Sequence, residues 1–175
     1  MTNPLVPVMD WYEIVRDGMR VTARVIRKEI PGAIVEKHVF HYEPPAESLR
    51  RLADADRELD DLVVLSLVAI FERALRDYLM GRTTIRLGGG DAIDEAVRAE
   101  VLNQIEYWRI SDRLIGVFRS RVDGKVLGMV KQIIGYRNWV AHGRASAGPP
   151  GGNVAPQIAF ETLTAFLDKA GLLAA

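Results

Sequence analysis

The stretch Leu62-Val63-Val64-Leu65-Ser66-Leu67-Val68-Ala69-Ile70-Phe71-Glu72-Arg73 decides the class of fold. Its apolar part, Leu62 to Phe71, is too short for a transmembrane helix, which needs about 20 apolar residues. The pattern instead predicts a buried helix. That helix belongs to a longer helical pattern from about Ala46 to Met80, which Gly81 is expected to close.

A single charged residue interrupts the apolar stripe of this predicted helix. Glu72 lies where the stripe expects an apolar side chain, and burying an unpaired carboxylate costs several kcal/mol. We therefore expect Glu72 to meet a cation on a neighbouring helix, with Arg137 and His142 as the candidates. The apolar members of the stripe are Leu62, Leu65, Val68, Leu75 and Leu79.

Turn residues divide the rest of the chain into further helices. Asp91 is a good N-cap, Asp123-Gly124 forms a turn, and residues 83–90 and 145–153 are rich in turn formers. The expected helices run from Asp91 to about Val122, from Lys125 to Gly143 and from Pro156 to Ala170. In the last of these, Ile158, Leu163, Phe166 and Leu167 are expected to pack in the core.

The first 45 residues are ambiguous. Apolar residues between positions 8 and 30 recur at steps of three and four, which favours a helix. Asp17-Gly18 and several β-branched residues favour a hairpin instead. We prefer the helix, which Pro31-Gly32 would stop, and expect Ala33–Tyr42 to be extended.

These elements predict an all-α fold, an up-and-down bundle of about four or five helices with a short extended segment near its start. The 175 residues are expected to form one domain. Residues 1–45 would form an N-terminal extension and residues 46–143 the core helices. Residues 144–155 would form a loop and residues 156–175 a C-terminal helix.

Composition excludes several classes of function. Lysine plus arginine and aspartate plus glutamate both number 23, and this balance argues against a general nucleic-acid coat, although a local cationic site remains compatible with it. There is no cysteine and there are three histidines, so we expect no metal and no cofactor. His38 and His41 precede Glu43 as a ligand pair would, but an extended segment would point them to opposite faces.

The chain begins without the basic and apolar segments of a signal peptide, so we expect a cytoplasmic protein with no membrane partner. Gly88-Gly89-Gly90 precedes a helix without the Gly-Lys-Ser/Thr of a P-loop and is expected to be a linker. The aromatic residues Tyr107, Trp108 and Trp139 are expected to lie in the core.

Candidate functional residues gather in Tyr136-Arg137-Asn138-Trp139-Val140-Ala141-His142-Gly143-Arg144. A histidine near neutrality can exchange protons in either direction, and the planar fork of an arginine suits phosphate oxygens. Because RNA carries its own nucleophile, the ribose 2′-hydroxyl, metal-free cleavage needs a proton-transfer group and a cation, which His142 and Arg137 would supply. A symmetric dimer would add the second histidine that acid-base cleavage works best with. Asn138 can orient the imidazole or hold phosphate. Lys131, Tyr136 and Arg144 are candidates for contacts with RNA.

One narrow stripe of the motif helix carries small and polar residues at steps of three and four. Two glycines inside a helix each cost roughly 1 kcal/mol relative to alanine, so they are expected where another backbone approaches closely. That backbone belongs either to a neighbouring helix of the same subunit or to a second copy across a two-fold axis. The stripe consists of Gly128, Lys131, Gly135, Asn138 and His142.

The sequence Arg137-Asn138-x-x-x-His142-Gly143 at the end of an apolar helix resembles the Arg-x4-6-His motif of the HEPN superfamily. The resemblance covers Val126–Gly143 and extends to Leu62–Tyr78. It implies a dimeric, metal-independent endoribonuclease that leaves 2′,3′-cyclic phosphate ends, with Arg137, Asn138 and His142 in the site. Glu72 resembles the acidic residue that some members carry on an earlier helix.

The resemblance also implies roles in toxin–antitoxin systems or antiviral defence, with an antitoxin or regulatory protein as partner. One subgroup, modified by a nucleotidyltransferase antitoxin, carries a tyrosine two residues after the histidine, where this chain has Arg144. The alternative hypothesis is a non-catalytic HEPN-like module that dimerises and binds a nucleotide or a partner protein. Full burial of Arg137 against Glu72 would favour that alternative.

Overall fold

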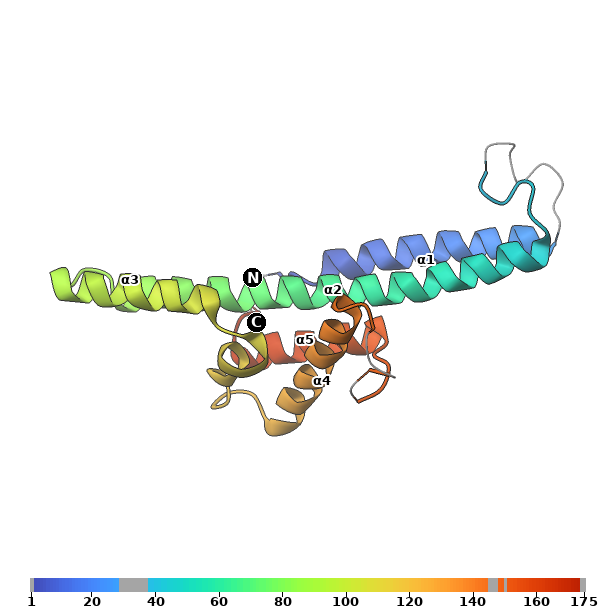
Figure 1. Ribbon diagram of the computed structural model, residues 1–175. Helices are drawn as coiled ribbons and strands as arrows, with labels where there is room; N and C mark the ends of the chain where they lie inside the picture. The colour runs from blue at the N-terminus through green and yellow to red at the C-terminus, as the bar shows by residue number, and fades with distance from the viewer. Residues whose placement is uncertain (1, 29–37, 145–147, 150, 174–175) are drawn as a thin grey trace. The chain divides into compact units, whose positions relative to one another are not determined.

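The computed structural model describes residues 2–28, 38–144, 148–149 and 151–173. These residues form helices joined by turns and include no strand, so the predicted all-α class is confirmed (Figure 1). The elements are α1 (Val6–Arg27), α2 (Pro45–Arg86), α3 (Ala92–Tyr107), a short π-helical turn η1 (Ile110–Leu114), α4 (Gly124–Ala141) and α5 (Pro156–Ala170).

The chain divides into two compact units, and the division falls inside α2. The first, here called the hairpin unit, is Val6–Val63 and contains α1 and the first part of α2. The second, here called the motif unit, comprises Met1–Leu5 with Val64–Ala175 and contains the rest of α2 and all later elements.

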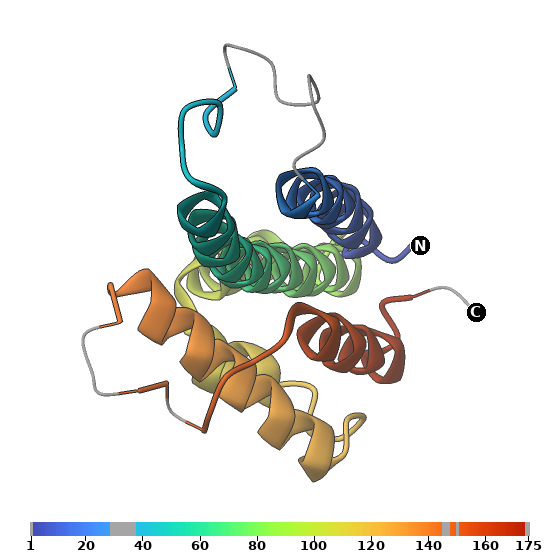
Figure 2. The same ribbon diagram turned by 90° about the vertical axis from the view of Figure 1, so that its right-hand side faces the viewer.

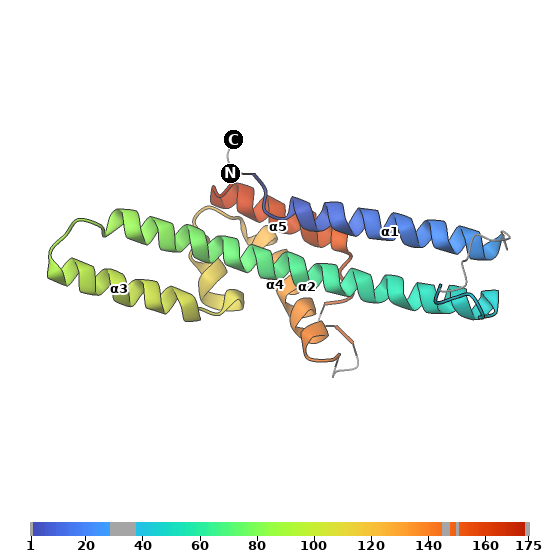
Figure 3. The same cartoon turned by 90° about the horizontal axis from the view of Figure 1, so that it is seen from above.

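In the hairpin unit, α1 runs alongside the first part of α2, as Figures 1 and 3 both show. The Tyr12 hydroxyl donates to Asp60 at 2.6 Å, and Arg16 lies 3.5 Å from Asp56. Burial beside the Asp60 carboxylate raises the pKa of Tyr12 well above its usual range, so the phenol stays protonated as a donor. The preference for a helix over a hairpin at the start of the chain is confirmed, with Asp17-Gly18 inside α1.

The segment before α2 corrects one expectation. Residues 38–43 form turns, in which the His41 amide donates to the His38 carbonyl at 3.0 Å and the Glu43 amide donates to the Phe40 carbonyl at 3.3 Å. The predicted extended conformation is therefore wrong over this part of Ala33–Tyr42, while residues 33–37 lie outside the described ranges.

Helix α2 ends later than predicted, and of its predicted stripe Val68 and Leu75 are buried as expected whereas Leu62 is not. It continues through Gly81 to Arg86, and the Thr84 hydroxyl donates to the Met80 carbonyl across the glycine. Leu62 is 53% exposed, whereas Val63, Val64, Leu67, Val68, Phe71 and Leu75 are buried. Ser66, four residues after Leu62 and likewise exposed, marks the outer face of this run.

Helix α3 starts as predicted and ends early. The Asp91 carboxylate accepts hydrogen bonds from the amides of Ile93 and Asp94, and the Asp94 carboxylate accepts one from the Asp91 amide, which completes a capping box. The expected continuation to about Val122 is wrong, because Trp108 and Arg109 have extended backbones and η1 follows. Tyr107, expected in the core, is 79% exposed.

The last two helices agree with prediction. Helix α4 is capped by Asp123, whose carboxylate accepts from the Val126 amide at 3.0 Å and pairs with Lys169 at 3.2 Å. The bond from Val126 and then the ammonium of Lys169 hold the pKa of Asp123 below its usual range. Helix α5 has the predicted bounds and packs against α4 (Figure 2), although Ile158, expected in the core, is half exposed.

An aromatic cluster fills the core of the motif unit. The rings of Phe71 and Phe166 meet edge to face with centroids 5.2 Å apart, and Phe118 meets Phe166 at 5.7 Å. Both Phe71 and Phe166 are fully buried. The cluster ties α2 to α5 and thereby fixes the part of α2 that carries Glu72.

Candidate functional site

Glu72 of α2 and Arg137 of α4 approach each other, as the sequence predicts. Oε2 of Glu72 lies 4.0 Å from Nη2 of Arg137, at the long limit for an ion pair. The Arg137 side chain keeps 30% of its surface exposed. Arg137 is therefore neither fully buried nor tightly bound by the carboxylate, so its charge reaches solvent.

A second arginine holds Glu72 more closely, and the sequence analysis did not identify it. Nη2 of Arg76 donates to Oε1 of Glu72 at 2.6 Å and to the Trp108 carbonyl at 2.8 Å. Its Nη1 donates to the carbonyls of Glu106, at 2.7 Å, and Ile105. The spacing of Glu72 and Arg76, four residues apart on a helix, was the available signal for this pair.

The Arg76 contacts explain why α3 stops at Tyr107. A helix leaves its last carbonyls without partners, and a guanidinium can satisfy several of them at once. The Arg76 guanidinium donates hydrogen bonds to the carbonyls of Ile105, Glu106 and Trp108. The end of α3 is thus fixed by a residue of α2, a tertiary effect that local pattern does not contain.

The charges of this cluster do not cancel. Glu72 contributes one negative charge between two guanidinium groups, and the pair with Arg76 is the shorter of the two at 2.6 Å against 4.0 Å. Because Arg76 is directed at carbonyls and Glu72, the uncompensated positive charge falls mainly on Arg137. An anion such as a phosphate would be attracted to this position.

Asn138 lies beside the arginine and one helical turn before the histidine. Its Oδ1 accepts a hydrogen bond from Nη1 of Arg137 at 3.0 Å. Its backbone carbonyl accepts from the His142 amide at 3.0 Å. Asn138 therefore orients the guanidinium, and the structure does not place its side chain on the imidazole.

The end of α4 presents His142 to solvent. His142 is the C-cap, and the next residue, Gly143, adopts φ +73°, a left-handed conformation that favours glycine. The amides of Gly143 and Arg144 donate to the carbonyls of Val140 and Trp139, which completes a Schellman motif. Within the described residues the imidazole has no hydrogen bond or ion pair, so the suggested contact between Glu72 and His142 is absent there.

The small-residue stripe of α4 is largely uncovered. Gly128, Lys131 and His142 are exposed, and a Cβ built on Gly128 would meet no atom within 4 Å. Close packing within the subunit therefore does not explain Gly128. The other explanation for this glycine, approach by a second copy of the helix, is compatible with the open face.

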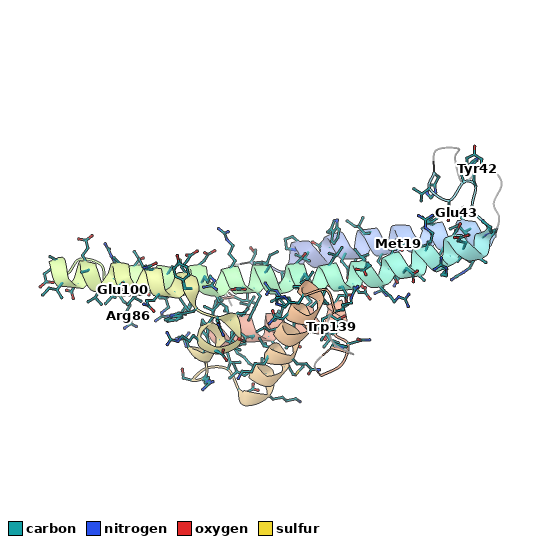
Figure 4. The ribbon with its side chains drawn as sticks, viewed as in Figure 1. Met19, Tyr42, Glu43, Arg86, Glu100 and Trp139 are labelled. Carbon is teal, nitrogen blue, oxygen red and sulfur yellow. The ribbon has the colours of Figure 1, made fainter. Side chains whose placement is uncertain are left out.

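The remaining predicted contact residues divide between surface and core. Lys131 and Arg144 are exposed. Tyr136 is only 6% exposed, and its ring lies 5.8 Å from that of Trp139 (labelled in Figure 4), so its burial suits a packing role and not contact with RNA. Among the residues that the structure describes, no group of three or more acidic or histidine side chains is arranged to hold a metal ion.

Comparison with known proteins adds no identification: no family model, curated protein or solved structure matches the chain. Over the described residues, none of the helices combines the length and the apolar character needed to cross a membrane.

Proposed function

We propose that this chain is a HEPN-type, metal-independent RNA endonuclease that acts as a homodimer. The observation that carries the proposal is the arrangement at the end of α4: a partly exposed arginine with excess positive charge, one and a half helical turns before an exposed histidine. The HEPN-like bundle arrangement belongs to the same proposal and draws support from the all-α fold.

In the proposed reaction, the RNA 2′-oxygen attacks the adjacent phosphorus. The new P–O2′ bond forms as the P–O5′ bond breaks, which leaves a 2′,3′-cyclic phosphate and a free 5′-hydroxyl without consuming water. Neutral His142 of one subunit takes the proton from the 2′-hydroxyl, and protonated His142 of the other gives one to the leaving 5′-oxygen. Arg137 stabilises the charge that develops on the phosphorane oxygens.

The other residues have supporting roles in this proposal. Asn138 and Glu72 orient Arg137, as the contacts at 3.0 Å and 4.0 Å suggest. Lys131 and Arg144 supply cationic surface for the flanking RNA. A role as a toxin or defence effector, restrained by an antitoxin or regulatory protein, is part of the same proposal and follows from the resemblance to HEPN proteins.

The partial exposure of Arg137 favours catalysis over the non-catalytic alternative. A purely structural ion pair would be expected to enclose both partners, whereas Arg137 lies at the limit of contact with Glu72. The open Gly128 face supports the dimer on which the two-histidine mechanism depends.

Cleavage of a mixed RNA pool in EDTA tests the proposal. The wild type should yield fragments with 2′,3′-cyclic phosphate ends, and His142→Ala should yield none. His41→Ala, which removes an exposed histidine from the hairpin unit, is the matched control and should cleave normally. Equal cleavage by wild type and His142→Ala would exclude the proposed proton-transfer group.

A further inference from the structure

The hairpin unit contains a cationic groove that shares no residue with the candidate functional site. The groove has a volume of about 590 Å³. It is lined by residues of α1, by Lys28 directly after α1, and by residues of the first part of α2. Met19 (labelled in Figure 4), Leu49 and Leu52 give it an apolar floor. The cationic residues of its wall are Arg16, Arg20, Arg24, Arg27 and Lys28.

Most of this positive charge is uncompensated. Among the described residues, Asp56 is the one acidic residue that lines the groove, and it pairs with Arg16 at 3.5 Å. Arg16 also lies 3.9 Å from Asp60. In the described part of the chain no carboxylate pairs with the other four cations of the wall. The groove is therefore neutralised at its Arg16 end and cationic along the rest.

The cations follow one face of α1 at steps of three and four residues. Arg20, Arg24 and Lys28 are each four residues apart, and Arg24 and Arg27 are three apart, so like charges are neighbours on the helix surface. Such pairs destabilise a helix unless an anion lies between them. A stripe of this kind is expected where a negatively charged ligand relieves the repulsion.

We propose that this groove binds the phosphate backbone of single-stranded RNA. The identification of the polymer as RNA rests on the proposed function, whereas the preference for a chain of phosphates rests on the groove itself. From Arg20 to Arg27 the uncompensated cations extend over about 10 Å of helix, which suits successive phosphates of a strand better than one compact anion.

The lining also indicates how the strand would be held. Within the described ranges no aromatic side chain lines the groove, so bases would not stack there as they do on many single-strand binding proteins. Contacts would be made mainly to phosphate, with the apolar floor beneath the strand. Binding is therefore expected to be tolerant of sequence and strongly dependent on salt.

Fluorescence anisotropy with a labelled single-stranded oligoribonucleotide of mixed sequence tests this proposal. Every protein carries His142→Ala, so that the RNA stays intact, and the groove variant adds R20Q, R24Q and R27Q. Glutamine retains high helix propensity while it removes the charge. The control adds R86Q, R113Q and R119Q instead, which removes the same charge from exposed positions of the motif unit.

The groove variant should bind RNA roughly tenfold more weakly or worse at low salt, and the control should bind much as the parent does. The slope of log K against log salt should become shallower by about 2, since each phosphate contact in a single strand contributes about 0.7. Equal losses in the two variants, or no loss in either, would overturn the proposal. Circular dichroism of each variant checks that the helices are retained.

Two further measurements separate the possible failures. Vesicles containing phosphatidylserine should show no binding that depends on the three arginines; arginine-dependent vesicle binding without RNA binding would overturn the proposal in favour of a membrane surface. Cleavage by the chain with native His142 is measured separately. If RNA is cleaved but its affinity does not depend on the three arginines, the groove proposal is wrong and the nuclease proposal stands. If the affinity depends on the arginines but no RNA is cleaved, the groove proposal is supported and the result counts against the nuclease proposal.

Discussion

Glu72 and Arg76 lie one turn apart on α2, and Oε1 of the carboxylate accepts a hydrogen bond from Nη2 of the arginine at 2.6 Å. Both side chains are about four-fifths buried, with 22% and 18% of their surfaces exposed. This pair connects the end of α3, through the carbonyls that Arg76 binds, to Arg137 on α4. It therefore links the stability of the motif unit to the placement of its candidate catalytic arginine.

Replacing Arg76 with alanine should lower the free energy of unfolding by about 2–3 kcal/mol. The change leaves Glu72 without its nearest cation and leaves the carbonyls at the end of α3 without a donor. Because both side chains of the pair remain partly exposed, the loss of stability should be smaller than for a fully buried pair. Urea unfolding measures the difference.

Arg73→Ala is the matched control for Arg76→Ala. Arg73 pairs with Asp77 at the surface, where both side chains are mostly exposed, so the loss should stay below about 0.5 kcal/mol. Equal losses for the two variants would show that the Arg76 contacts do not stabilise the motif unit.

Replacing Arg137 with alanine should abolish cleavage with a loss of stability below about 1 kcal/mol. Glu72 keeps its bond to Arg76 in this variant, so no carboxylate is left unpaired. Arg137→Lys retains the charge without the planar fork and should restore cleavage only in part. Unfolding and single-turnover cleavage are measured on the same samples; full activity in Arg137→Ala would exclude the arginine from the reaction.

Gly128→Leu should weaken self-association and raise the stability of the isolated subunit by up to about 1 kcal/mol. A side chain at Gly128 meets nothing within the subunit, and leucine favours a helix over glycine. Sedimentation velocity measures the association, and Gly135→Leu, on the same stripe of α4, provides a second test.

Gly81→Leu is the control for the Gly128 substitution. Gly81 also lies inside an exposed stretch of helix with no atom within 4 Å of a built Cβ, so its helix gains stability in the same way. Gly81→Leu should leave association unchanged. A Gly128→Leu chain that associates as well as the wild type would remove this face of α4 from the dimer interface.

Asp123 should make the stability of α4 sensitive to acid. The Val126 amide and then Lys169 lower the folded pKa of this carboxyl, so its contribution is fully present above the unfolded pKa of about 3.9. The contribution is lost as the pH falls through the lower folded pKa. Thermal unfolding should place Asp123→Asn below the wild type at pH 6, with the gap closing as the pH falls through the lowered folded pKa of Asp123; a gap that is constant with pH would contradict the linkage.

Local signals predicted several elements because they act within one helix. The bounds of α5 follow from Pro156 at its start and Gly171, with φ +81°, after its end. The Asp91 capping box and the glycine after His142 are similarly local. In the site, the approach of Arg137 to Glu72 was predictable because a charge in an apolar stripe requires a partner.

A tertiary contact accounts for one feature that the sequence did not reveal. Arg76 of α2 binds the carbonyls at the end of α3, so the helical pattern that continues past Tyr107 did not indicate the break. The exposure of Leu62, in contrast, had a local signal, because the polar Ser66 lies four residues later on the same exposed face. The pairing of Arg76 with Glu72 likewise had a local signal in their spacing of four residues on α2.

The most direct test of the proposed mechanism uses an RNA oligonucleotide that the wild type cleaves at a mapped position. Its partner differs only in lacking the 2′-hydroxyl at the nucleotide that precedes the cleaved phosphate, and both are incubated in EDTA. In the proposed mechanism the natural oligonucleotide is cleaved to a 2′,3′-cyclic phosphate and the 2′-deoxy partner remains intact at that position. Cleavage of both at equal rates would contradict the mechanism, because the ribose hydroxyl would then not be the nucleophile.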